Sequence, residues 1–253
     1  MVLESFQLSG KNALVTGSSR GLGAAIAVAL AQAGANVGCH GRGADGKATS
    51  EQIRKMGRKS FYLAGDMASP ELPAALIGKT VEEFGSIDIL VNNAGTIRRA
   101  PAAEYPQTQW DEDIAVNLTS LFRLSQLAGQ EMLKCGAGKI LNIASILSFQ
   151  GGITVPAYAA AKGGLAQLTK ALANEWASKG INVNAIAPGY MATDNTTALR
   201  QDPQRSRQIM ERIPAGRWGE SSDLAGAAVF LCSSASDYVH GHVLVVDGGW
   251  LGR

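Results

Sequence analysis

The stretch TGSSRGLG, Thr16 to Gly23, joins a short apolar run to an alanine-rich segment. The run before it, NALVT at Asn12 to Thr16, predicts a buried strand, and the residues from Gly21 to Ala33 predict a helix. Glycines at positions 17, 21 and 23 let a backbone turn tightly and approach a pyrophosphate, and the amino terminus of the next helix offers free N–H groups. The pattern indicates a nucleotide site, with a purely structural turn as the alternative.

The same alternation of apolar runs and helical patterns continues along all 253 residues. Strands are predicted at Asn12 to Thr16, Ala35 to Cys39, Ser60 to Ala64, Asp88 to Asn93, Lys139 to Ala144, Ile181 to Pro188 and His242 to Gly249. Helices are predicted at Gly21 to Ala33, Ala44 to Met56, Pro70 to Phe84, Gln107 to Lys134, Ala157 to Lys179 and Ser222 to Ser233. Such alternation gives parallel sheets with right-handed crossovers. We therefore expect an α/β fold, a Rossmann-type doubly wound seven-stranded parallel sheet with helices on both faces, in a single domain over residues 1–253.

One segment, from Tyr190 to Gly219, interrupts the alternation and is rich in Asn, Thr and Arg. It follows the carboxyl end of a predicted strand, where ligands of open α/β sheets bind. The sequence therefore predicts a substrate-covering loop at residues 190–219.

Composition and charge exclude several classes of function. With 23 basic and 21 acidic residues the net charge is +2, so nothing favours a nucleic-acid partner or an anionic membrane surface. The cysteines, at positions 39, 135 and 232, fit neither a disulfide framework nor a zinc motif, which favours a cytoplasmic setting without a metal. The opening residues do not have the pattern of a signal peptide. Gly21 to Cys39 carries no charge over 19 residues, but alanine, glycine and the break at Gly34 favour a buried helix and strand over a membrane span.

The end of the second predicted strand bears on cofactor choice. Sites for NAD usually place a carboxylate there to bind the adenosine ribose, whereas this chain has His40, Gly41 and Arg42. Arg42, with Arg20 in the glycine stretch, could instead pair with a 2′-phosphate. We expect NADP(H) to be preferred and NAD(H) to be possible, unless both arginines are simply solvated.

Further strings complete a recognisable set: NNAG at Asn92 to Gly95, Ser145, and Tyr158-Ala-Ala-Ala-Lys162. Together with the glycine stretch they make essentially the whole chain resemble the short-chain dehydrogenase/reductase family. Strings such as NIASILSFQGG, RIPAGRWGE and VDGGWLGR resemble a bacterial branch named for 2-deoxy-D-gluconate 3-dehydrogenase and 2-dehydro-3-deoxy-D-gluconate 5-dehydrogenase. The resemblance implies an NAD(P)-dependent oxidoreductase that interconverts a hydroxyl and a ketone on a six-carbon sugar acid in uronate catabolism.

The resemblance also implies site residues. The expected catalytic residues are Asn117, Ser145, Tyr158 and Lys162. The expected cofactor contacts are Gly17, Ser19, Arg20, Gly21, Leu22, Gly23, Arg42, Asp66, Met67, Asn93, Ala94, Gly95, Tyr158, Lys162, Pro188, Gly189 and Thr193. Tyr158 would exchange a proton with the substrate oxygen, which Ser145 would also hydrogen-bond. Lys162 would bind the nicotinamide ribose, and Asn117 would hold a water that links Lys162 to solvent. Asp66 and Thr193 could otherwise be ordinary loop caps.

Tyr158 and Lys162 are four residues apart, so they share one face of a helix. A free tyrosine has a pKa near ~10, and lowering it by about 3 takes ~4 kcal/mol. A lysine ammonium at ~4 Å supplies about that much at an effective dielectric of ~20. We therefore predict that Lys162 lowers the pKa of Tyr158.

A sugar acid needs a cation for its carboxylate and hydrogen-bond partners for its hydroxyls. The candidates are Arg98, Arg99, Gln150, Asn195 and Arg205, although adjacent arginines in a loop are often only solvated. By family resemblance Trp250 packs in a homotetramer interface close to a neighbour's active site, with packing inside one subunit as the alternative. The other functions to consider are a 3-ketoacyl-carrier-protein reductase, which would need a basic docking surface, and a noncatalytic cofactor-binding scaffold.

Overall fold

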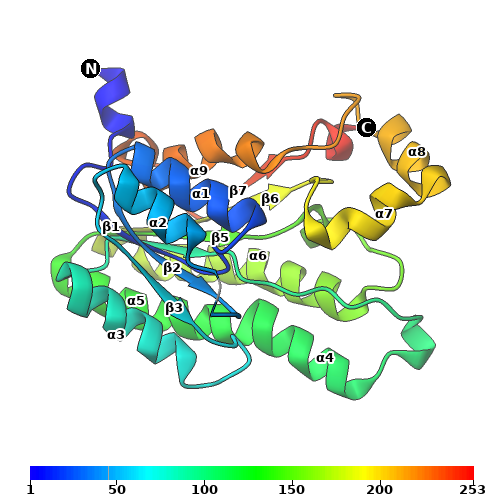
Figure 1. The fold of residues 1–253 in the computed structure, drawn as a ribbon, viewed down its shortest axis with the longest axis horizontal. Coiled ribbons are helices and arrows are strands. Elements are labelled where there is room, and N and C mark those ends of the chain that lie inside the picture. Colours follow the sequence, from blue (N-terminus) through cyan, green and yellow to red (C-terminus); the bar gives the residue numbers. More distant parts are fainter. Residues whose placement is uncertain (45) are drawn as a thin grey trace.

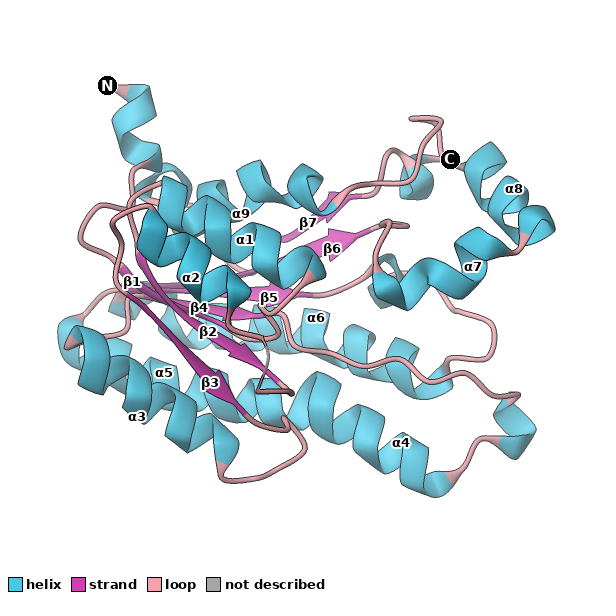
Figure 2. Cartoon of the chain, in the orientation of Figure 1, coloured by secondary structure: helices cyan, strands magenta, loops and turns pink. Residues whose placement is uncertain are grey.

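A single parallel sheet runs through the computed structural model, which describes residues 1–44 and 46–253 (Figures 1 and 2). Its strands are β1 (Asn12–Val15), β2 (Asn36–Gly41), β3 (Ser60–Ala64), β4 (Ile89–Asn92), β5 (Gly138–Ile143), β6 (Ile181–Pro188) and β7 (Val243–Val246). They lie in the order β3-β2-β1-β4-β5-β6-β7, and every pairing is parallel. The predicted seven-stranded, doubly wound sheet is confirmed.

Helices cover both faces of the sheet (Figure 1). They are α1 (Gly21–Gln32), α2 (Ala48–Lys55), α3 (Leu72–Phe84), α4 (Gln107–Ile114), α5 (Ser120–Cys135), α6 (Pro156–Trp176), α7 (Thr197–Gln201), α8 (Pro203–Arg212) and α9 (Ala225–Cys232). One apolar core joins the sheet to α1, α2 and α9, and a second joins it to α3, α5 and α6. The strands therefore bury both faces, which is why their sequences are apolar runs rather than alternating patterns.

The uncharged stretch from Gly21 to Cys39 divides as predicted into a helix and a strand. In α1, Ile26 and Leu30 are completely buried, and β2 lies between β1 and β3. Gly34 adopts a φ of 118° between them, a conformation that favours glycine. Among the residues that the structure describes, no helix is long and apolar enough to cross a membrane.

The chain reverses its direction of sheet growth between β1 and β4, which places a crevice at their carboxyl ends. The Thr16 hydroxyl links the two strands there. Its Oγ1 accepts hydrogen bonds from the backbone N–H groups of Asn93 at 3.1 Å and Ala94 at 3.0 Å, and donates to the Val91 carbonyl oxygen at 3.3 Å. The glycine stretch and the NNAG turn are therefore held against each other.

Two predicted helices differ from the observed ones. The helix predicted at Gln107 to Lys134 is α4 and α5 joined by a π-helical turn at Ala115–Thr119, and such turns are common at functional sites. The helix predicted at Ala44 to Met56 begins only at Ala48, and its residue 45 lies outside the described residues.

The expected substrate-covering loop at residues 190–219 contains two helices that the sequence analysis did not predict, α7 and α8, and its covering of the substrate stays a prediction. The Asp202 carboxylate accepts a hydrogen bond from the backbone N–H of Arg205 at 3.0 Å, and Pro203 occupies the first turn of α8. Ile209 is the one buried residue in α8, so this helix lacks the apolar stripe by which helices are recognised in a sequence.

Candidate active site

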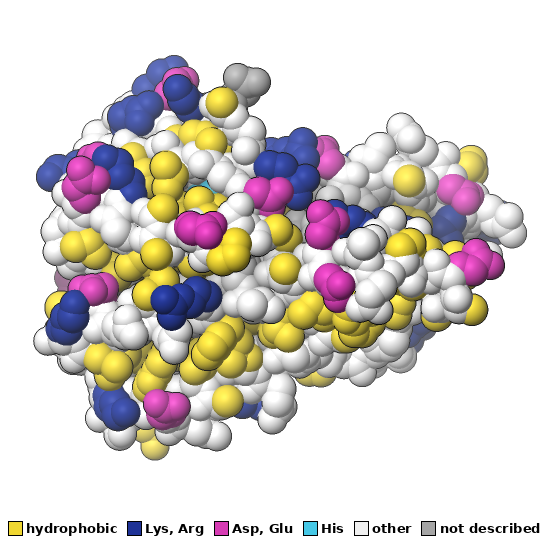
Figure 3. Space-filling model, turned by 90° about the horizontal axis from the view of Figure 1, so that it is seen from below, with side chains coloured by type: hydrophobic (Ala, Val, Ile, Leu, Met, Phe, Trp, Pro, Cys, Tyr) yellow, Lys and Arg dark blue, Asp and Glu magenta, His cyan; other side chains and the backbone are white. Residues whose placement is uncertain are grey.

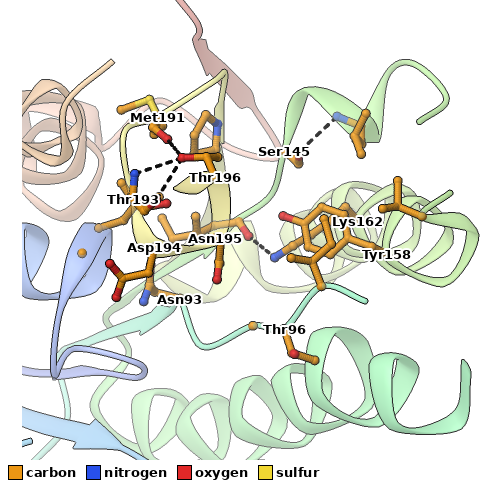
Figure 4. Close-up of a pocket in the computed structure, with 18 of the residues that line it drawn as sticks. Asn93, Thr96, Ser145, Tyr158, Lys162, Met191, Thr193, Asp194, Asn195 and Thr196 are labelled. Carbon is orange, nitrogen blue, oxygen red and sulfur yellow. Dashed lines mark hydrogen bonds between the residues drawn. The ribbon is translucent and has the colours of Figure 1, made fainter. Parts of the chain in front are cut away.

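A cleft of about 930 Å³ lies along the carboxyl ends of the strands. Its lining includes these predicted cofactor contacts: Gly17, Ser19, Arg20, Gly21, Leu22, Gly23, Arg42, Asp66, Met67, Asn93, Ala94, Gly95, Tyr158, Lys162, Pro188, Gly189 and Thr193. The lining also includes Ser145, Arg99, Gln150, Asn195 and Arg205 from the other predicted sets. In Figure 4, Ser145, Tyr158 and Lys162 lie on the right of the cleft, and Thr193 and Asp194 lie on the left.

The cofactor end of the cleft is formed by the glycine stretch. Gly17 and Gly21 have φ values of 63° and 58°, which a residue with a side chain rarely adopts. A Cβ on Gly23 would stand 2.3 Å from the Gly17 carbonyl oxygen, so only glycine allows this close packing. Within residues 1–44 and 46–253, no side chain caps the amino terminus of α1. Its first N–H groups thus remain available to an anion in the cleft, which fits the pyrophosphate of a dinucleotide.

His40 holds this end together, a role that the sequence did not reveal. It is 2% exposed; its Nδ1 accepts a hydrogen bond from the Gly17 N–H at 3.2 Å, and its Nε2 lies 3.1 Å from the Gly65 carbonyl oxygen. A carbonyl only accepts, so Nε2 carries the proton and the ring is neutral. Burial lowers the pKa of His40, which favours the same form. One imidazole therefore spans the glycine stretch and the loop after β3.

Two arginines at the cofactor end form ion pairs with residues on other segments. Arg20 Nε lies 3.2 Å from an Asp194 carboxylate oxygen, and Arg42 Nε lies 3.6 Å from a carboxylate oxygen of Asp66. All four side chains are substantially exposed, so these pairs add little stability and can exchange partners. Both guanidinium groups line the cleft, and their binding to a phosphate on the adenosine ribose stays a prediction. Asp66 also caps its own loop by accepting from the Ala68 N–H at 2.9 Å.

Asn117 is fully buried in the π-helical turn and lies outside the cleft lining. Its Oδ1 accepts from the Thr96 N–H at 3.0 Å, and its Nδ2 donates to the carbonyl oxygens of Thr96 at 2.9 Å and Asp113 at 2.8 Å. The amide therefore fixes the segment that follows NNAG.

Ser145 follows β5, and Tyr158 projects from the first turns of α6 (Figure 4). Burial raises the pKa of Tyr158, while the hydrogen bond with Ser145 and then the charge of Arg99 act in the opposite direction. A raised pKa keeps the phenol protonated at neutral pH, the form needed to donate a proton.

The prediction that Lys162 lowers the pKa of Tyr158 was wrong, because the pKa of Tyr158 is raised. Lys162 Nζ lies 5.6 Å from the centre of the Tyr158 ring and donates a 2.6 Å hydrogen bond to the Ile143 carbonyl oxygen. Lys162 is 3% exposed, and burial lowers its own pKa to about 8. Burial disfavours the charged form of both Lys162 and Tyr158, and the sequence argument had no means of including it.

Arg98 and Arg99 are adjacent in sequence but face different surroundings. Arg98 Nη1 lies 2.6 Å from a carboxylate oxygen of the fully buried Asp113, and its Nη2 lies 2.5 Å from Glu112. Tyr105 also donates to Asp113, at 2.9 Å. Arg98 is absent from the cleft lining, so its expected contact with substrate is corrected: it neutralises a buried carboxylate, which would be costly to leave unpaired.

At the other end of the cleft, Arg99 and Arg205 are accompanied by a third arginine, Arg212, that the sequence analysis missed. Among the residues that the structure describes, none of the three forms an ion pair. Asp66 and Asp194, the two carboxylates among the described lining residues, are already paired with the cofactor-end arginines. This end therefore has an excess of positive charge, which favours an anionic ligand.

Trp250 packs inside its own subunit at this end, and is 4% exposed there. Its ring centre lies 4.6 Å from that of Tyr190, and Arg212 lies over its face, with Cζ 4.0 Å from the ring centre. This burial agrees with the alternative of packing within one subunit, and the expected contact of this end with a neighbouring subunit stays a prediction. Arg212 was missed because only this tertiary contact distinguishes it from the solvated arginines of α8.

No group of three or more His, Cys, Asp or Glu side chains within residues 1–44 and 46–253 is placed to hold a metal ion.

The fold, the glycine-lined cleft and the Ser145, Tyr158 and Lys162 side chains at its centre define a dinucleotide-dependent oxidoreductase. A family model described as "Enoyl-(Acyl carrier protein) reductase" matches residues 17–251. The chain is also 53% identical to the 2-dehydro-3-deoxy-D-gluconate 5-dehydrogenase of Dickeya dadantii over 255 residues, covering 100% of both proteins. This chain belongs to the short-chain dehydrogenase/reductase family.

Solved structures agree with this assignment. One from Agrobacterium tumefaciens, with bound NADP, is 57% identical with a TM-score of 0.92, covering 98% of this chain and 99% of that chain. A gluconate 5-dehydrogenase from Burkholderia cenocepacia, in complex with NADP and tartrate, is 40% identical with a TM-score of 0.95 and covers 100% of both chains.

Proposed function

We propose that this protein is an NADP(H)-dependent oxidoreductase that interconverts a hydroxyl and a ketone on a six-carbon sugar acid, of the 2-dehydro-3-deoxy-D-gluconate 5-dehydrogenase or 2-deoxy-D-gluconate 3-dehydrogenase type, in uronate catabolism. The observation that carries the proposal is the arrangement of one cleft. It has two arginines at its glycine-lined end, Ser145 and Tyr158 between the ends, and at its other end three arginines that form no ion pair with any described residue. The names of the relatives at 53% identity support the same substrate class.

The cofactor is assigned from chemistry and from relatives. Arg20 and Arg42 offer charge to a 2′-phosphate, and no carboxylate follows β2 where NAD sites usually have one. Similar structures hold NADP. When bound, the cofactor supplies or accepts the hydride at its nicotinamide. NAD(H) remains usable at lower affinity, because the remaining contacts do not involve the 2′ position.

Tyr158 exchanges the proton with the substrate oxygen. In the direction of reduction its protonated phenol donates to the substrate oxygen, and Ser145 hydrogen-bonds the same oxygen and stabilises the charge that develops there. Lys162 binds the nicotinamide ribose. Asn117 holds a water that links Lys162 to solvent, the role that the family resemblance implies. Asn195 and Gln150 are proposed as partners for substrate hydroxyls.

The substrate end selects for an anion. Arg99 and Arg205, the contacts expected from the sequence, share this end with Arg212. The described lining has no unpaired carboxylate to compensate the charge of these three arginines. A carboxylate pairs well with a guanidinium in such a partly enclosed site.

The second candidate function is the reduction of ketones on an acyl carrier protein. It is supported by the matching family model, whose description names an acyl-carrier-protein reductase. An acidic carrier would need a basic docking surface around the cleft mouth. A noncatalytic scaffold is less well supported, because Ser145, Tyr158 and Lys162 are placed together in the cleft.

The test follows the absorbance of reduced nicotinamide with purified protein, comparing NADPH with NADH on the 2,5-diketo acid derived from 2-dehydro-3-deoxygluconate. A Tyr158→Phe variant is the control, and we expect its turnover to fall by about 10²–10⁴-fold while NADPH binding persists. A wild-type protein that binds NADPH but reduces only ketoacyl thioesters would overturn the sugar-acid proposal. Equal turnover by the Phe variant would remove Tyr158 from the chemistry.

The same proposal includes a homotetramer in the cytoplasm. Figure 3 shows the side of the molecule that carries α3, α4 and α5 in Figure 1, and hydrophobic side chains gather there between scattered charges. Trp110 on α4, and Phe122 and Leu133 on α5, are 37%, 42% and 38% exposed. Large apolar side chains on neighbouring helices favour a subunit contact. Light scattering coupled to size exclusion tests the tetramer, and a monomer would contradict it.

A further inference from the structure

The substrate end of the cleft contains a connected group of three side chains from distant parts of the chain: Gln150, Arg212 and Trp250. The Trp250 Nε1 donates a hydrogen bond to Gln150 Oε1 at 3.1 Å, and the Arg212 guanidinium stacks on the Trp250 ring with its Cζ 4.0 Å from the ring centre. All three line the cleft. Gln150 lies on the loop between Ser145 and Tyr158, so the group reaches the segment that carries the chemistry.

We propose that Arg212 is the cation that recognises the substrate carboxylate, and that Trp250 is the positioning residue that fixes both Arg212 and the hydrogen-bonding amide of Gln150. The inference rests on the proposed sugar-acid function and assigns the residues that give it specificity.

Arg212 is the best prepared of the three arginines. Arg205 Nη1 already donates to Gln208 Oε1 at 3.3 Å. Arg99 and Arg212 are both exposed, but Arg99 lies on a loop with no hydrogen bond, ion pair or ring contact among the described residues to fix its guanidinium. Arg212 makes no ion pair there either, but the indole face holds its plane. A stacked guanidinium keeps all its N–H donors in its plane and loses little freedom when a carboxylate binds.

Trp250 can orient Gln150 in one way only. An indole N–H is a donor, so it must face the amide oxygen, and this leaves the Nε2 group of Gln150 directed elsewhere as a donor. A donor in that place suits a hydroxyl or carbonyl oxygen of a sugar acid.

Trp250 is itself well fixed. The Asp247 carboxylate accepts from the backbone N–H groups of Gly249 and Leu251, each at 2.8 Å, which closes the turn around the tryptophan. Arg253 donates to the Glu211 carbonyl oxygen at 2.9 Å and so attaches the end of the chain to α8. The carboxyl-terminal segment and the helix that carries Arg212 therefore form one packed unit.

The experiment compares the acid substrate with its neutral amide, using the full-length protein and NADPH. Arg212→Gln should raise KM for the acid by about 10- to 100-fold, with a much smaller change in kcat, and should leave KM for the amide within about 3-fold. Trp250→Phe keeps a ring for stacking but removes the N–H donor, so we expect a smaller rise in KM, about 3- to 10-fold, for the acid. The matched control is Arg207→Gln, which removes an exposed α8 arginine paired with Glu211 and absent from the cleft lining.

NADPH affinity, measured by fluorescence titration, should be unchanged in all these variants, which separates substrate recognition from a damaged fold. Equal losses on the acid and the amide, or no loss in Arg212→Gln, would overturn the assignment. A wild-type protein that binds NADPH but does not turn over the acid would instead remove the proposed function, so the two failures are distinguishable.

Discussion

The Thr16 hydroxyl joins the two walls of the cofactor cleft, and replacing it with valine isolates that contribution. Valine keeps the shape of threonine but cannot accept the hydrogen bonds from the N–H groups of Asn93 and Ala94. Thr16 is completely buried, so water cannot replace the lost acceptor. Each unsatisfied buried N–H costs about 1–3 kcal/mol, and the greater apolarity of valine returns part of this. We expect Thr16→Val to lower the free energy of unfolding by about 2–4 kcal/mol.

Thr16→Ser is the matched control, because it keeps the hydroxyl and removes only a methyl group, at a cost of about 1 kcal/mol. Urea unfolding followed by tryptophan fluorescence gives both values, at one protein concentration so that subunit association does not differ. NADPH affinity should fall in the valine variant and persist in the serine variant, since the NNAG turn would no longer be held against the glycine stretch. If valine costs no more than serine, the hydroxyl does not hold the cleft as argued.

Three other perturbations test the cofactor end. Arg42→Ala should weaken NADPH about 10- to 100-fold and NADH less than about 3-fold in fluorescence titrations, and equal losses would refute the 2′-phosphate assignment. Burial lowers the pKa of His40, so its neutral form stabilises the fold fully above the unfolded pKa of about 6.5, and that stability is lost as pH falls below this value. In urea unfolding, the loss in the free energy of unfolding should reach at most about 1.4 kcal/mol per pH unit, and less where the charge of Asp66 opposes the shift. The loss should be smaller in His40→Asn, and the same pH profile in both proteins would show that His40 is not its source. Gly23→Ala should abolish detectable NADPH binding, because the new Cβ would stand 2.3 Å from a backbone oxygen. Gly78→Ala in α3, where a Cβ meets nothing within 4 Å, should bind normally and be up to about 1 kcal/mol more stable; similar behaviour of the two alanines would refute the packing argument.

Burial and distant contacts account for the predictions that changed. Lys162 was expected to lower the pKa of Tyr158, but an estimate from spacing treats both groups as though their surroundings were uniform. In the structure Lys162 is 3% exposed, and desolvation is the largest cause of the pKa shift of each group. The helices α7 and α8 were predicted as loop because they bury little apolar surface, so the periodic signal on which helix prediction depends is weak there.

The sequence alone determined the parallel sheet and the glycine-lined cofactor end, because each depends on residues close together in the chain. The candidate group of Ser145, Tyr158 and Lys162 was expected from the resemblance to the short-chain dehydrogenase/reductase family, and only the spacing of Tyr158 and Lys162 on one helix face follows from the chain itself. Apolar runs define strands, glycines define a turn, and a spacing of four defines a helix face. Only the tertiary structure decided which arginines face the cleft. Arg98 and Arg99 are neighbours with the same side chain, yet Arg98 pairs with a buried carboxylate on α4 and Arg99 lines the cleft. Trp250 likewise reaches Gln150 across 100 residues. Such contacts are set by how layers pack in three dimensions, and no local pattern records them.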